Sequence, residues 1–113
     1  MDYDASLAAR LSEQLQSYTG ISEKRMMGGI CFFLNGNMLC GADQSRDGQR
    51  RFMFRVGKEQ EVEALARNGA SPVEFSGRKM GGMVFVDEAA CNAAAIRDWI
   101  DLSMQFVSQF EPK

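Results

Sequence analysis

An Asn-Gly pair between two apolar runs constrains the fold of this chain more than any other feature. Asn35-Gly36 separates Ile-Cys-Phe-Phe-Leu from Met-Leu-Cys. A type I′ turn needs positive φ at both central residues, and Asn followed by Gly tolerates this well. We therefore predict a β-hairpin with strands near 30–35 and 38–43. Gly28 and Gly29 precede the first run, where glycine lets the backbone bend or approach a neighbour closely.

A two-residue turn also determines which residues face each other across the hairpin. Cys31 is expected opposite Cys40 in a non-hydrogen-bonded pair, where Cα atoms approach to about 4.5 Å and a disulfide is geometrically possible. The two thiols are thus a candidate redox pair, and the alternative is that both are small buried hydrophobes. The other predicted pairs are Leu34 with Asn37, Phe33 with Met38, and Phe32 with Leu39.

Three helices are predicted from apolar residues at helical spacing. The first covers about 5–19, with Asp4 as its cap and Gly20 as its stop. The second covers 58–68, and the third runs from Asp87 or Asn92 to about Gln109. Their apolar stripes consist of Leu7, Leu11, Leu15 and Tyr18; of Val62, Leu65 and Ala66; and of Ile96, Trp99, Ile100, Ser103, Val107 and Phe110.

Strands outside the hairpin follow from alternating patterns. In residues 51–56, Phe52, Phe54 and Val56 face one way. Shorter strands are expected at 73–76 and 83–86, joined through 77–82, and residues 23–27 form an extended segment. The order α-β-β-β-α-β-β-α predicts a single domain, residues 1–113, of the α+β class, a two-layer fold with helices packed on an antiparallel sheet.

Composition limits the classes of function. The chain has 113 residues, a net charge of −2 and no histidine, so it lacks the usual general base and the commonest metal ligand. We expect no catalytic residue, no metal and no cofactor. No apolar run approaches the roughly 20 residues that span a bilayer, and no signal pattern opens the chain. The three cysteines form no C-x-x-C. Together with the absence of a long apolar run and of a signal pattern, this predicts a cytoplasmic protein with free thiols and no membrane partner.

The hairpin is apolar on both faces, although only one face can meet the helices. The second face carries Met and Phe residues beside arginines from the next strand, a composition typical of protein interfaces. We predict that this face is either covered as well or binds a protein partner, with a homodimer as the expected assembly. The candidate partner surface consists of Phe33, Met38, Arg51, Met53 and Arg55.

Arginines also cluster in the sequence, which raises the question of nucleic-acid binding. Such clusters are usually solvated strand ends. Nucleic-acid contact is possible but not favoured, because the net charge is negative and few aromatic residues are interleaved for base stacking. The residues concerned are Arg46, Arg50, Arg51 and Arg55, and Arg25, Arg78 and Lys79 are further candidates for the same patch.

One pattern occurs twice. Residues 25–32 and 78–85 both fit R-x-M-G-G-x-x-F. The simpler interpretation is that two strand entrances need the same bend. The alternative is that the two segments converge on one surface.

Arg25, Met26, Gly28 and Gly29, followed by a hairpin with the Asn35-Gly36 turn, resemble the N-terminal domain of the TfoX/Sxy family. The resemblance extends from about Leu15 to Phe106. It implies a two-layer α+β domain similar to secretion-chaperone-like folds, with no agreed catalytic residue. Founding members are cytoplasmic regulators of natural competence that act on transcription of DNA-uptake genes. They carry a second, helical C-terminal domain, which is not expected in this chain because it ends at Lys113.

Together these features predict a non-enzymatic regulatory or protein-interaction module. The first alternative is a DNA-associated transcription regulator of the competence type, which requires a basic surface with salt-dependent DNA binding. The second is a small-molecule-binding protein or enzyme, which requires a deep pocket with converging polar groups.

Overall fold

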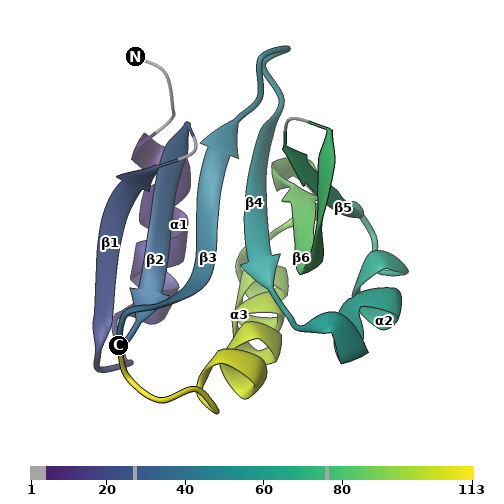
Figure 1. The fold of residues 1–113 in the computed structure, drawn as a ribbon. Coiled ribbons are helices and arrows are strands. Elements are labelled where there is room, and N and C mark those ends of the chain that lie inside the picture. The colour runs from purple at the N-terminus through teal and green to yellow at the C-terminus, as the bar shows by residue number, and fades with distance from the viewer. Residues whose placement is uncertain (1–4, 27, 76) are drawn as a thin grey trace.

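The computed structural model describes residues 5–26, 28–75 and 77–113. Within them the chain forms a six-stranded antiparallel sheet in the order β1-β2-β3-β4-β6-β5, with α1 and α3 behind it (Figure 1). The predicted two-layer α+β architecture is confirmed. The elements are α1 (Ala5–Leu15), β1 (Ile21–Met26), β2 (Gly29–Leu34), β3 (Asn37–Gln44), β4 (Arg50–Arg55), the 3-10 turn η1 (Lys58–Gln60), α2 (Glu61–Leu65), β5 (Ala70–Phe75), β6 (Arg78–Asp87), the 3-10 turn η2 (Glu88–Ala90) and α3 (Ala93–Val107).

The predicted hairpin is β2–β3. Asn35 and Gly36 have φ values of 51° and 84°, as a type I′ turn requires. Leu34 lies opposite Asn37, and Phe33 lies opposite Met38. The turn and these two pairs are therefore confirmed.

The register of the hairpin changes beyond Phe33, which corrects the cysteine prediction. A bulge lies between Phe32 and Phe33, so that Phe32 faces Cys40 and Cys31 faces Gly41. Since a bulge adds one residue to one strand, every later pair shifts by one position. Because both faces of the hairpin are apolar, the sequence pattern did not reveal the shift. The prediction that Cys31 lies opposite Cys40 is wrong, and the geometric basis for a redox pair is lost.

The main core lies between the sheet and the helices. Leu7, Leu11 and Leu15 of α1 are buried as predicted. From α3, the indole of Trp99 stacks on Phe54 with ring centroids 5.4 Å apart and an interplanar angle of 11°. Large aromatic side chains such as these contribute much of the apolar area that a core buries.

The first two helices are shorter than predicted. Helix α1 ends at Leu15, so Tyr18 leaves the apolar stripe and its hydroxyl donates to Asp101 Oδ1 at 3.3 Å. The predicted cap Asp4 lies outside the described residues. In the second helix Leu65 packs against the main core as predicted, whereas Val62 and Ala66 are exposed, which corrects the rest of the predicted stripe. Ala64 is buried in their place. The first residues of the predicted helix form η1, and this 3-10 turn changes which side chains of the helix face the core.

The third helix begins at the later of the two predicted positions. Asn92 caps it, because its side-chain oxygen accepts a hydrogen bond from the backbone N–H of Ala95 at 2.9 Å. The predicted stripe is buried from Ile96 to Val107. Phe110 follows the helix and is exposed. No helix in the described part of the chain has the length and hydropathy needed to cross a membrane.

The sheet contains one strand more than the predicted order. The segment predicted as merely extended is edge strand β1, which pairs with β2 over its whole length. Residues 78–82, expected in a connecting loop, belong to β6. Strand β6 inserts between β4 and β5, so the last three strands are not in sequence order.

Candidate functional site

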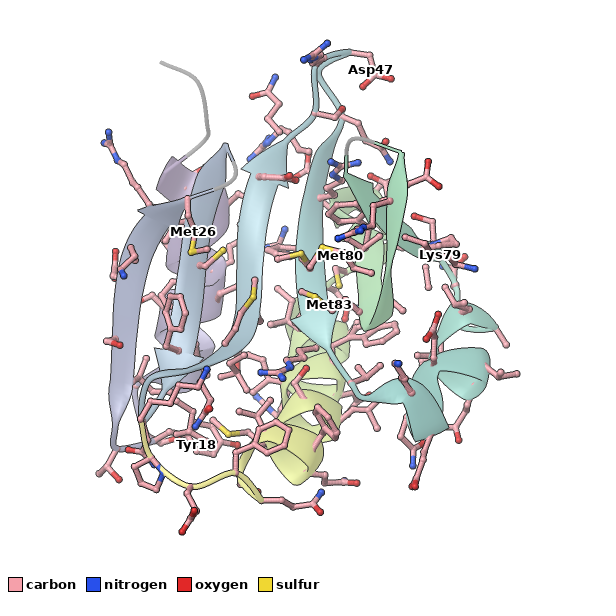
Figure 2. The ribbon with its side chains drawn as sticks, viewed as in Figure 1. Tyr18, Met26, Asp47, Lys79, Met80 and Met83 are labelled. Atoms are coloured by element: carbon pink, nitrogen blue, oxygen red, sulfur yellow. The ribbon has the colours of Figure 1, made fainter. Side chains whose placement is uncertain are left out.

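The side of the sheet away from the helices carries a second apolar cluster. Since Phe52 and Phe54 point into the main core, Met53 between them points to this opposite side. Figure 2 shows Met26, Met80 and Met83 in front of the sheet, while α1 and α3 lie behind it. We call this cluster the methionine face: Cys31, Met53, Val73, Met83 and Phe85 are buried, and Met26, Phe33, Met38 and Met80 are partly buried around them.

The methionine face has a packed floor and a more open rim. Met53 and Met83 are each only 6% exposed, although no helix among the described residues covers them. Met26, Phe33, Met38 and Met80 are more exposed. A partner that docks here would therefore meet the rim side chains above a layer that is already packed.

Arg51 is fixed at one end of this face. Its Nε and Nη2 donate to the two carboxylate oxygens of Asp43 at 2.9 and 3.3 Å. Its guanidinium also lies over Phe85, with Cζ 3.6 Å from the ring centroid. A bidentate ion pair combined with stacking holds an arginine more firmly than either contact alone.

Arg55 is held at the other end of β4. Its Nη1 donates to the backbone oxygen of Met38 at 3.3 Å. Its Cζ lies 5.6 Å from the ring centroid of Phe106 and 4.9 Å from that of Phe110. Arg55 thereby links the sheet to the segment that follows α3.

That segment returns to the β2–β3 turn. The side-chain amide of Asn37 donates to the backbone oxygen of Glu111 at 2.9 Å. The backbone N–H of Lys113 donates to the backbone oxygen of Asn35 at 2.8 Å. The Asn-Gly turn is thus also the place where the end of the chain is anchored (Figure 1).

A family model matches residues 13–107 of this chain, which is most of its length, and its description is the TfoX N-terminal domain. The chain belongs to the TfoX N-terminal domain family. This family is linked to competence regulation and is not a known enzyme family. No curated protein and no solved structure matches the chain.

The TfoX-type motif residues form the corner between β1 and β2. Gly28 has a φ of 78°, a conformation that glycine adopts at low cost. A Cβ at Gly29 would lie 2.1 Å from the backbone oxygen of Ala42. Both glycines are therefore explained by backbone geometry. Arg25 lies exposed on β1, and Met26 packs against the methionine face.

The repeated R-x-M-G-G segments meet the same face of the sheet. Met26 from the first segment and Met80 from the second both pack against the methionine face. Their glycines have different surroundings, since Gly82 has a φ of 83° and lies against the backbone of Gly57. Met27, which corresponds to Met80 in the pattern, lies outside the described residues.

The structure places all five predicted surface residues on the methionine face or at its ends. Met53, however, is buried beneath the rim residues, so it packs inside the methionine face and is not available for direct contact with a partner. Sequence reasoning missed the contribution of β6. The alternation of Met83 and Phe85 with Val84 and Val86 could have indicated that this strand places Met83 and Phe85 together on one face.

The three thiols are buried and protonated at neutral pH. Burial raises the pKa of Cys31 to about 11, and the nearby Asp43 adds to the rise. Burial also raises the pKa of Cys91 to about 11 and that of Cys40 further still. Because the thiolate is the reactive form, these cysteines are poor nucleophiles.

Two arginines of the predicted cluster, Arg50 and Arg51, are paired with carboxylates within the chain, whereas Arg46, Arg78 and Lys79 are exposed. Arg50 forms an ion pair with Glu88 at 3.2 Å. Arg51 is paired with Asp43, and Arg55 lies over aromatic rings. The two ion pairs reduce the positive charge that Arg50 and Arg51 offer to phosphates, whereas the ring contacts of Arg55 occupy its guanidinium without neutralising it. In the described part of the chain, no group of three or more His, Cys, Asp or Glu side chains could hold a metal ion.

A hollow of about 580 Å³ lies between the end of β4, η1 and α3. Its size falls within the range of small-molecule sites. Arg55, Lys58 and Phe106 are among the residues that line it. The guanidinium of Arg55 already contacts Met38 and two phenylalanine rings, so this cation of the wall is engaged by the protein itself.

Proposed function

We propose that this TfoX N-terminal domain is a non-enzymatic regulatory module that works in the cytoplasm through protein contacts and self-associates through its methionine face. The observation that carries the proposal is the gathering of five methionines on the side of the sheet away from the helices. They come from β1, β3, β4 and β6, so the fold brings together residues that are distant in the sequence.

The chemistry of this face suits protein binding. Methionine side chains are flexible and polarizable, so they adapt to a partner's shape. Arginines are enriched at interfaces, and Arg51 and Arg55 are held at the two ends of β4 by contacts within the chain. A partner therefore meets an adaptable apolar band between two fixed cations.

Regulation of the competence type through direct DNA contact is the alternative. The ion pairs of Arg50 and Arg51 and the net charge of −2 favour protein contacts instead. Fluorescence anisotropy with labelled duplex DNA at stepped salt concentrations separates the two. The proposal expects no binding even at low salt, whereas tight binding that weakens steeply with salt would support the alternative.

Methionine methyl groups provide a direct test of the proposed surface. In a dilution series of the chain labelled with ¹³C at its methionine methyls, the signals of Met26, Met38 and Met80 should shift or broaden as concentration rises. Met104 is an internal control, because it packs against the main core on the helix side. Methyl signals that are all independent of concentration would contradict self-association, and equal shifts at Met104 would contradict the assigned face.

A further inference from the structure

Edge strand β1 directs the polar backbone groups of alternate residues away from the sheet. The backbone oxygen of Gly20 accepts a hydrogen bond from the N–H of Asn35 at 2.8 Å, so Gly20 faces β2. Hydrogen bonding alternates along an antiparallel pair, so Ser22 and Lys24 also face β2. The N–H and C=O groups of Ile21 and Glu23 then point outward, where no described strand follows (Figure 1).

The two edges of the sheet are not equivalent. The other edge, β5, contains Pro72, which lacks an N–H, and the register shifts between Pro72 and Glu74. Prolines and bulges are common devices that protect edges from pairing with other chains. Strand β1 carries charged residues, which are another such device, but it has no proline and pairs with β2 over six residues without an irregularity. The backbone groups of β1 are therefore more available to an additional strand than those of β5.

A groove runs beside this edge on the helix side. It has a volume of about 450 Å³ and lies between α1 and the β1–β2 pair. Ala8 and Ala9 line it from the helix, and Ile30 and Phe32 line it from β2. We call it the edge groove.

Two carboxylates flank the edge groove. Glu13 on α1 and Glu23 on β1 both line it, and both are exposed. Neither forms an ion pair within the described residues. Glu23 lies opposite Phe32, so its side chain is on the groove side of the sheet. An occupant of this groove would meet apolar surface beside negative charge.

We propose that β1 accepts an extended segment of a partner protein as an additional strand. In this segment one apolar side chain enters the edge groove, and Lys or Arg residues two positions away face Glu13 and Glu23. Alternate side chains of a strand point to the same side and are about 7 Å apart. The two basic side chains of the partner segment therefore lie on the side of the sheet that carries Glu13 and Glu23. Backbone hydrogen bonds to Ile21 and Glu23 supply affinity, and the groove supplies selectivity. This surface is separate from the methionine face and goes beyond the function proposed above.

The test uses the ¹⁵N-labelled full chain and the acetylated, amidated peptide Thr-Lys-Thr-Val-Thr-Lys-Thr. In the free chain the amides of Ser22 and Lys24 should exchange slowly and those of Ile21 and Glu23 rapidly. Saturating peptide should slow the exchange of Ile21 and Glu23 about tenfold or more, because their N–H groups become bonded. A peptide with Glu in place of both Lys residues should bind at least tenfold more weakly.

Matched variants locate the contact. Glu23→Lys should weaken peptide binding, whereas Glu59→Lys, the same change at an exposed residue of η1, should not. Phe33→Glu should leave peptide binding intact, which distinguishes this surface from the methionine face. Unprotected Ile21 and Glu23 amides in the presence of peptide would overturn the proposal. Slow, concentration-dependent exchange at these amides in the free chain would also overturn it, because the edge would then be occupied by a second copy.

Discussion

The guanidinium carbon of Arg51 lies 3.6 Å from the centroid of the Phe85 ring, while the same guanidinium forms a bidentate ion pair with Asp43. The three residues come from β4, β6 and β3, so one side chain joins three neighbouring strands on the side of the sheet without helices. The side chains of Arg51 and Asp43 are 19% and 14% exposed. Arg51 thus acts as a packing residue of the methionine face as much as a surface charge.

Replacement of Arg51 should destabilise the fold measurably. Arg51→Ala removes a charge-assisted pair and a stacked ring contact, and we expect a loss of about 2 kcal/mol in the free energy of unfolding. Arg51→Lys should recover less than half of it, because an ammonium lacks the planar fork. Urea unfolding measures both. Arg46→Ala, in the exposed β3–β4 loop, is the control, and equal effects of the two alanine variants would contradict this role.

The two glycines of the TfoX-type motif should differ in their tolerance of alanine. Gly29→Ala places a Cβ against the backbone oxygen of Ala42 and should cost about 3 kcal/mol. Gly28→Ala meets open space and should cost only the penalty of a positive φ, about 1–2 kcal/mol. Thermal or urea unfolding ranks them. The reverse order would show that the close approach of β2 and β3 does not limit this position.

The buried thiols predict how stability depends on pH. The pKa of Cys31 and of Cys91 is about 11 in the folded chain, above the ordinary value of 9.0. The unfolded chain therefore loses these protons first, and the stability that the neutral thiols contribute is intact below pH 9 and declines as pH rises toward 11. Urea midpoints between pH 7 and 10.5 should be flat and then fall.

A suitable background removes a tyrosine that titrates in the same pH range. Desolvation and Asp101 raise the pKa of Tyr18, which acts in the same direction. The series is therefore run in Tyr18→Phe. In that background Cys91→Ala should make the alkaline decline shallower, and a decline of unchanged slope would contradict the assignment to the thiol.

Asn37 should anchor the segment after α3. It is 3% exposed and donates to the backbone oxygen of Glu111. Asn37→Ala should cost about 1–2 kcal/mol and speed amide exchange at Lys113, whose N–H bonds to Asn35. Asn68→Ala, at an exposed position, should change neither quantity. Unaltered exchange at Lys113 in the Asn37 variant would show that the segment is held by other contacts.

Local sequence signals predicted the parts of the fold that local physics determines. The Asn35-Gly36 turn follows from its need for positive φ, and the α3 stripe from Ile96 to Val107 follows from helical spacing. Strand β1 was predicted only as an extended segment. Its exposed, charged residues have no alternating apolar pattern, and its pairing depends on β2.

Non-local pairing explains what the sequence could not show. The insertion of β6 between β4 and β5 places Met83 and Phe85 beside Met53, although these strands are separated by a helix in the chain. The sequence therefore predicted five residues of this surface but not their neighbours on β6, which are Met80, Met83 and Phe85. The shift at Phe32 was hidden for a different reason, since a strand that is apolar on both faces fits more than one register.

Sedimentation velocity of the parent chain and Phe33→Glu tests the central claim most directly. Phe33 lies in the rim of the methionine face, whereas Val62, the control site for Val62→Glu, lies exposed on α2. Urea unfolding of each variant first establishes that it is folded. The account predicts concentration-dependent dimers for the parent and for Val62→Glu, and monomers for Phe33→Glu. Monomers for all three chains, or undiminished dimers for Phe33→Glu, would contradict self-association through the methionine face.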